Sequence, residues 1–102
     1  MPTNRMRPIH PGEILREEYL TPLGMSANAF AQALHVPTNR VTAILNERRA
    51  VSADTALRLA RALGTTPQFW LNLQQTYELR VAEGHLGADL KAVKPIRRTT
   101  AA

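Results

Sequence analysis

The chain has 102 residues, 44% hydrophobic and 21% charged, a composition typical of one globular domain with a modest core. It carries 13 Lys and Arg against 8 Asp and Glu, and the resulting net charge of +5 favours a polyanionic partner. Because it lacks cysteine, an apolar run long enough to span a membrane and a secretory signal pattern, we expect a cytoplasmic protein without disulfides or thiolate metal sites.

Positive charge is concentrated at both ends and in one central segment. Residues 1–12 and 91–102 contain Lys or Arg and no acid, while residues 38–61 contain five arginines against two acids. We expect a basic arm at 1–10, a folded domain at 11–82 and a flexible basic tail at 83–102. The central segment has two interpretations, a strip that faces DNA or a solvated surface.

Five helices and no strand are expected, since no segment alternates apolar and polar residues between hairpin turns. Prolines and Ser or Thr N-caps mark their starts, and glycine marks an end. The expected helices cover residues 11–19, 26–34, 37–45, 53–63 and 67–81. In the fourth helix, Ala56, Leu57, Ala60 and Leu63 are expected to form the buried stripe.

The third of these helices has two different faces. Val41, Ile44 and Leu45 share one apolar side, and Asn39 and Ala43 point to the opposite side at 100° per residue.

Only His35 and Val36 separate the second helix from the third. A short helix, a tight turn and a helix with a polar front are typical of the helix-turn-helix unit. At the end of the third helix, we expect Asn46 to adopt the left-handed conformation.

A polar helix face of this kind fits the major groove of DNA, where Asn39 can read an adenine edge, and Thr38, Arg40 and Thr42 can contact bases or phosphates. Contacts are expected from the third helix, from the N-terminus of the second and from two arginines after the third. The expected DNA-binding residues are Ser26, Asn28, Thr38, Asn39, Arg40, Thr42, Ala43, Arg48 and Arg49. The alternative interpretation is an exposed polar surface on an ordinary helical bundle.

The fifth helix carries apolar residues around much of its circumference, which indicates a contact beyond the monomer core. Trp70, Leu73 and Tyr77 are the expected dimer-interface residues. Core packing is the alternative for Trp70, Leu73 and their neighbour Phe69. A two-fold dimer would also let two recognition helices read two half-sites about one DNA turn apart.

Residues 26–49 resemble the Xre/Cro-type helix-turn-helix. The segments HPGEILREEYL at 10–20 and TALRLARALGTTPQFWLNLQ at 55–74 resemble the HigA (VapI-like) antitoxins of type II toxin–antitoxin modules. The resemblance covers about residues 6–82, and the two outer motifs are specific when they occur together at this separation.

The resemblance implies an all-α five-helix bundle that dimerises through its C-terminal helical region. It also implies binding to a palindromic operator, autorepression of the operon and neutralisation of a HigB-like mRNA endoribonuclease. The DNA-reading positions of the family correspond to Thr38, Asn39, Arg40, Thr42 and Ala43.

Three residues depart from the pattern of this family. His35 and Glu47 stand where glycine is common, and Ala43 stands where a longer polar residue is common. His35 must therefore adopt a positive φ or lie in a shifted turn. The acid at position 47 weakens the electrostatic case for DNA.

No catalytic, cofactor or metal site is expected, and neither is a membrane or small-molecule partner. The three histidines are far apart in sequence, and the adjacent Glu17 and Glu18 point in different directions on a helix.

Two rival functions stay open, a solitary Xre-type repressor without a toxin and a protein-binding module that no longer binds DNA. A neighbouring small basic reading frame would discriminate the first rival. Steeply salt-dependent DNA binding would discriminate the second.

Overall fold

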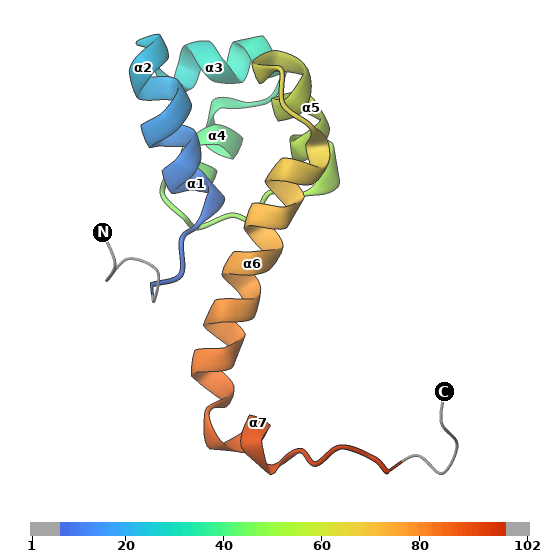
Figure 1. The fold of residues 1–102 in the computed structure, drawn as a ribbon. Helices are drawn as coiled ribbons and strands as arrows, with labels where there is room; N and C mark the ends of the chain where they lie inside the picture. Colours follow the sequence, from blue (N-terminus) through green and yellow to red (C-terminus); the bar gives the residue numbers. More distant parts are fainter. Residues whose placement is uncertain (1–6, 98–102) are drawn as a thin grey trace.

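The computed structural model describes residues 7–97, and over this range every regular element is helical. The elements are α1 (Pro11–Ile14), η2 (Leu15–Leu20), α2 (Thr21–Leu23), α3 (Ala27–Leu34), α4 (Thr38–Leu45), α5 (Ala53–Leu63), α6 (Pro67–Leu86) and α7 (Ala88–Ala92). Since α1, η2 and α2 form one continuous rod, the described chain contains the five expected helices and the short α7. The all-α class is confirmed. The second half of α6 extends away from α1 to α5 and leads to α7 (Figure 1).

The first helical rod is longer than expected, because it continues through Thr21–Leu23 and ends at Gly24 with φ 65°. Pro22 has no N–H and would clash with the carbonyl of the preceding turn in a regular α-helix. The wider π-helical hydrogen bonding of η2 lies just before this proline, where the Thr21 N–H donates to the carbonyl of Arg16. This wider turn accommodates Pro22 within the rod.

Side-chain caps fix the starts of α1, α3, α5 and α6, and each cap leaves fewer backbone N–H groups unpaired. Ser26 caps α3, Ser52 caps α5 and Thr66 caps α6, each by accepting an N–H from the first turn. At α1 the cap is His10, whose Nδ1 accepts the Gly12 N–H at 2.9 Å.

Gly12 brings α1 directly against the C-terminal end of α4. A Cβ atom at this position would overlap the backbone carbonyl of Ile44. Glycine is therefore required by the close approach of two backbones, and the first helical rod is fixed against α4 at this point.

The core is apolar and is built by η2, α3, α4, α5 and α6, with Ile14 of α1 packed against it. Trp70 is its largest residue and is 0% exposed, with its indole N–H donating to the Thr65 hydroxyl at 2.7 Å. In α5 the buried residues include Leu59, whereas Leu57 is 60% exposed, so the predicted stripe was wrong at this residue. The buried core comprises Leu15, Leu20, Phe30, Ala31, Leu34, Val41, Ile44, Val51, Ala56, Leu59 and Trp70.

The C-terminal helix does not stop where the sequence predicted. Helix α6 runs on to Leu86, so the expected domain boundary at residues 82 and 83 falls within it, and α7 lies in the segment expected to be a flexible tail. At the other end, residues 7–10 pack against the domain, since His10 is buried and Arg7 pairs with Glu13 at 2.9 Å. Residues 1–6 and 98–102 of the two expected arms lie outside the described residues.

Within residues 7–97, no helix combines the length and apolar character that crossing a membrane requires.

Candidate nucleic-acid interface

The tight turn between α3 and α4 is built on a residue with a left-handed backbone. His35, which stands where glycine is common in the family that the sequence resembles, ends α3 with φ 60°. Of the two conformations expected for this residue, it therefore adopts the one with a positive φ. The Arg58 guanidinium from α5 reaches this turn and donates to the carbonyls of Leu34 and His35 at 2.9 and 3.2 Å. These bonds satisfy carbonyls at the end of α3 and hold the turn against α5.

Helix α4 has the expected apolar back and polar front. Val41 and Ile44 are buried, whereas Asn39 is exposed and Thr42 and Ala43 are half-buried. The prediction was wrong by one residue at the end of the helix. Asn46 has φ −89°, and Glu47 adopts the left-handed conformation with φ 62°.

The C-terminal end of α4 is fixed by a contact from the first rod. Arg16 donates to the carbonyl of Leu45 at 2.9 Å, close to the point where Gly12 meets Ile44. A basic group at a helix C-terminus also complements the helix dipole. The outward face of α4 therefore has a defined orientation relative to the body of the domain.

The N-terminal end of α4 is joined to both neighbouring helices by polar contacts. The Thr38 hydroxyl donates to the side-chain oxygen of Asn28 at 2.7 Å, which links α4 to the start of α3. Arg40 donates to the carboxylate of Asp54 at 2.8 Å, which links α4 to the start of α5. The structure thus brings together the starts of three helices around predicted DNA-binding residues.

One oxygen atom of the Asp54 carboxylate accepts hydrogen bonds from two arginines. Its Oδ1 accepts from Arg40 and from the Arg58 Nε, at 2.8 and 2.7 Å. The hydrogen bond from Arg58 is the main cause of a lowered Asp54 pKa, and Arg40 acts in the same direction. The carboxylate is therefore ionised at neutral pH and carries a negative charge beside α4.

The remaining predicted DNA-binding residues lie at the edges of this surface. Arg48 and Arg49 are exposed in the loop after α4, and Ser26 is exposed at the start of α3. The Ser26 hydroxyl accepts the Ala29 N–H at 3.1 Å, so it has a structural role as a cap. DNA contact by these residues stays a prediction.

Sequence reasoning missed the residues that hold this surface in place. Asp54 and Arg58 were identified from the sequence only as charged residues, and Gln74 only as part of the motif at 55–74. Gln74 is 7% exposed, and its side-chain oxygen accepts the Val51 N–H at 2.8 Å, which ties the loop after α4 to α6. A buried glutamine in a family motif is the one signal that could have indicated this role.

The expected dimer interface requires a correction at Trp70. This side chain is 0% exposed and packs beside Tyr19 and Phe69 in the core, so it is not available to a partner chain. The core-packing alternative therefore holds for Trp70, whereas the adjacent Phe69 is 38% exposed. Neighbouring side chains differ by about 100° around the helix, which explains their different exposure.

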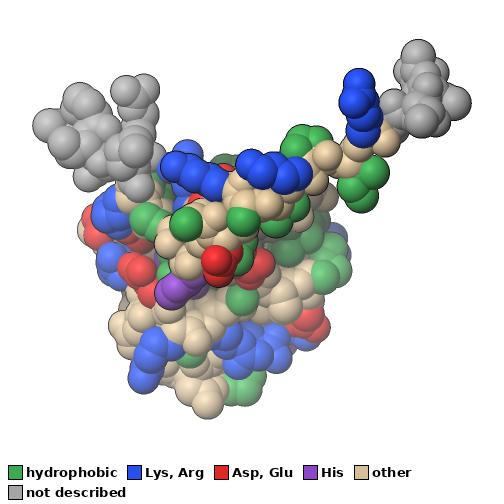
Figure 2. All heavy atoms as spheres, turned by 90° about the horizontal axis from the view of Figure 1, so that it is seen from below, with side chains coloured by type: hydrophobic (Ala, Val, Ile, Leu, Met, Phe, Trp, Pro, Cys, Tyr) green, Lys and Arg blue, Asp and Glu red, His purple; other side chains and the backbone are tan. Residues whose placement is uncertain are grey.

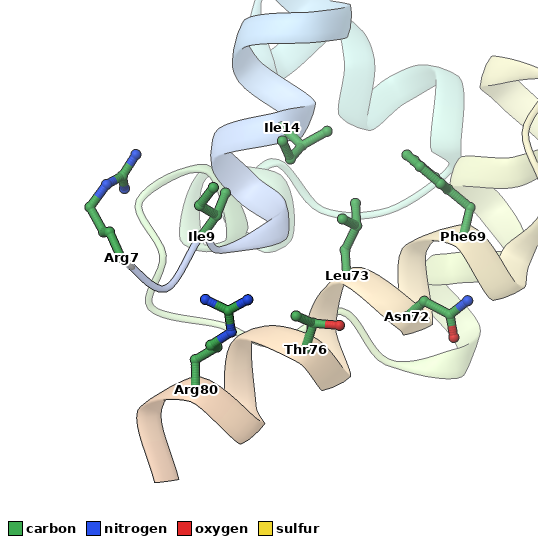
Figure 3. A pocket seen from close by; sticks show the side chains of 8 residues that line it. All are labelled: Arg7, Ile9, Ile14, Phe69, Asn72, Leu73, Thr76 and Arg80. Atoms are coloured by element: carbon green, nitrogen blue, oxygen red, sulfur yellow. The ribbon is translucent and has the colours of Figure 1, made fainter. Parts of the chain in front are cut away.

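Leu73, a second expected interface residue, lines a hollow of about 430 Å³ between α6 and residues 7–14. Phe69, Ile9 and Ile14 supply further apolar walls, and the arginines of the hollow lie at the end away from Phe69 (Figure 3). Tyr77, the third expected residue, is half-buried and meets the His10 ring edge-on at 4.8 Å. The interface role of Leu73 and Tyr77 stays a prediction.

The far half of α6 and the segment after it expose further apolar side chains. Leu79, Leu86 and Leu90 are 62%, 45% and 45% exposed, and Val93 is 71% exposed. At this end of the molecule, hydrophobic side chains lie beside Lys and Arg (Figure 2). These side chains lie outside the core of the described chain, and they are available to a partner.

The His10 cap makes stability depend on pH. Burial is the main cause of a His10 pKa below its usual value of 6.5, while Glu47 and the Arg49 backbone act in the opposite direction. Because the unfolded chain binds this proton more readily, we expect stability to be retained above pH 6.5 and lost as the pH falls below it, through the lower folded-state pKa. Urea unfolding between pH 5 and about 8 measures this.

His10→Asn is the control, because asparagine can cap a helix but does not titrate in this range. The variant should lose the part of the pH dependence that belongs to His10. An unchanged slope in the variant would show that another group causes it.

Comparisons with known proteins agree with this architecture. Residues 15–70 match the helix-turn-helix family. The chain is 58% identical over 80 residues to virulence-associated protein I of Dichelobacter nodosus, covering 78% of this chain and 74% of the relative. It is 38% identical over 96 residues to antitoxin HigA-1 of Vibrio cholerae serotype O1, covering 94% of this chain and 90% of the relative.

Solved structures share the fold. An addiction module antidote protein of a HigA family from Coxiella burnetii superimposes with a TM-score of 0.84 and 57% identity, over 88% of this chain and 99% of that one. Antitoxin GraA in complex with its operator gives a TM-score of 0.84 and 54% identity, over 90% and 94%.

Proposed function

The chain belongs to the HigA (VapI-like) antitoxins of the Xre-type helix-turn-helix family, and from this premise we propose a double function. The protein represses its own operon by binding a palindromic operator as a homodimer, and it neutralises a HigB-like mRNA endoribonuclease. Both activities belong in the cytoplasm, and neither requires catalysis by this chain.

The outward face of α4 is the observation that carries operator binding. Its polar front is exposed or half-buried, and contacts from Arg16, Asn28 and Asp54 fix its ends against three other elements. A helix held in this way can enter the major groove without reorganisation, which lowers the cost of binding. Arg48 and Arg49 lie beside it for phosphate contacts.

The homodimer is supported by the exposed apolar side chains along the second half of α6. In the described residues this half extends beyond the core, and Leu79 and Leu86 are at least 45% exposed (Figure 1). An isolated helix of this kind gains stability by packing against a second copy. Neutralisation of a toxin is supported by the similarity to antitoxins over nearly the whole chain.

Arg40→Ala is expected to weaken operator binding by about 5- to 150-fold, corresponding to about 1–3 kcal/mol for an arginine that reads a base. The fold should persist, because the side chain lies on the surface of α4 and alanine favours helix. An operator sequence selected from random duplexes by the unsubstituted protein supplies the probe, and fluorescence anisotropy measures the affinity.

Arg61→Ala is the matched control, since it removes an exposed arginine from the last turn of α5. It should change operator affinity by less than about threefold. Equal losses in the two variants would contradict a specific role for Arg40. Failure of the unsubstituted protein to bind any duplex at low salt would favour the protein-binding rival.

A further inference from the structure

We propose that Asp54 is a specificity-determining residue, which positions the Arg40 guanidinium to read a guanine edge instead of binding phosphates at random. This inference rests on the proposed binding of operator DNA by α4. Asp54 belongs to α5, 14 residues away from Arg40 in sequence, and it is joined to Arg40 by a contact of 2.8 Å.

The contact with Asp54 uses only one nitrogen atom of the Arg40 guanidinium. Asp54 accepts from one terminal nitrogen, Nη1, of the Arg40 guanidinium. A guanidinium carries five donors in a planar fork, so a bond at Nη1 restrains the position of the group while the edge formed by Nε and Nη2 keeps its own donors. That edge has the two-donor geometry that matches O6 and N7 of guanine.

The carboxylate is itself held in position. The Nε of Arg58 donates to the same Asp54 oxygen at 2.7 Å, and Nη1 of Arg58 donates to the end of α3. The helix-turn-helix therefore closes a chain of contacts that runs from the end of α3 through Arg58 and Asp54 to Arg40. Displacement of Asp54 would require this chain to break.

The negative charge has a second effect on Arg40. An isolated arginine on this surface would bind phosphate on any duplex, because phosphate contacts carry no sequence information. Asp54 competes with such phosphates for the guanidinium, and its side chain is 57% exposed on the same side as Arg40. An operator that offers guanine at the correct position gains a second partner for Arg40 without losing the first.

Asp54→Asn tests this inference by separating specificity from affinity. Binding to a scrambled duplex should strengthen by about two- to fivefold, because one acidic charge leaves the surface. The ratio of affinities for the selected duplex and the scrambled duplex should fall by about five- to tenfold, because the two-donor contact is no longer preorganised. A repeated selection with the variant should show a degenerate position where the unsubstituted protein prefers guanine.

Two further measurements separate positioning from a general charge effect. Asp89→Asn removes an exposed acid from α7, and its ratio should equal that of the unsubstituted protein. In an Arg40→Ala background, Asp54→Asn should no longer change the ratio, because Asp54 acts through Arg40.

An unchanged ratio in Asp54→Asn, with both duplexes bound more tightly, would overturn the inference and leave the proposed operator binding intact. The inference would also be overturned if Asp54→Asn lowered the ratio of affinities equally in the Arg40→Ala background. If the unsubstituted protein selects no sequence at all, the proposed function and this inference fail together. Thermal unfolding of each variant verifies that the fold is retained.

Discussion

Trp70→Ala is expected to lower the free energy of unfolding by about 3–5 kcal/mol, the usual cost of removing a large buried aromatic side chain. Trp70 is 0% exposed, donates to Thr65 and packs beside Tyr19 and Phe69. The variant leaves a cavity among these groups and an unpaired hydroxyl partner. Urea unfolding followed by circular dichroism measures the loss.

Phe69→Ala is the control for this prediction, because the neighbouring ring is 38% exposed. It should cost less than about half as much, since part of its surface already faces water. If Trp70 contributed to a dimer interface and not to the core, Trp70→Ala would lower the dimerisation constant while leaving monomer stability nearly unchanged. That result would contradict the position of Trp70 in the structure.

Gly12→Ala is expected to destabilise the fold by about 2–3 kcal/mol through overpacking. The added methyl group would overlap the Ile44 carbonyl, so α1 must move away from α4 or the end of α4 must distort. A loss of this size lowers the melting temperature by about 8–24 °C in a domain of this length. Operator binding should also weaken, because the same contact fixes the end of α4.

Gly84→Ala is the matched control, since Gly84 lies inside α6 and a Cβ there would meet no atom within 4 Å. Alanine should stabilise this helix by about 0.5–1 kcal/mol. If Gly12→Ala lowers stability and Gly84→Ala raises it, the close packing around Gly12 is the reason that glycine is necessary there. Unchanged stability in Gly12→Ala would contradict the contact between α1 and α4.

The local parts of the fold were predictable from the sequence. Ser26, Ser52 and Thr66 act as the N-caps that their residue types predict, and Gly64 ends α5 with φ 73°. The polar front and apolar back of α4 followed from the 3.6-residue period. Interactions between near neighbours decide all of these features.

Features that depend on contacts between distant segments were not predictable. Both Trp70 and Phe69 suit a core, and only the packing of α6 against the other helices decides which one is buried. Leu57 and Leu59 present the same ambiguity in α5. The left-handed residue after α4 is Glu47 and not Asn46, although α4 itself ends at Leu45 as predicted.

The candidate site likewise combines local features, which the sequence predicted, with contacts between distant segments, which it did not. The polar positions on α4 followed from its period. In contrast, Asp54 contacts Arg40 of α4 across 14 residues of sequence, and Arg58 contacts the end of α3 across 24 residues. The family motif PQFWLNLQ likewise contributes Trp70 to the core and Gln74 to the loop after α4. The motif therefore identifies the scaffold, and the residues proposed to read DNA lie elsewhere.

Co-expression with the adjacent reading frame of the same operon tests the proposed antitoxin function most directly. The adjacent product is expressed alone and then together with this protein, while growth and co-purification are measured. The proposed function predicts growth arrest by the adjacent product, relief of that arrest by this protein, and a complex that purifies intact. Growth unaffected by the adjacent product, with no complex, would contradict the antitoxin function and leave a solitary repressor.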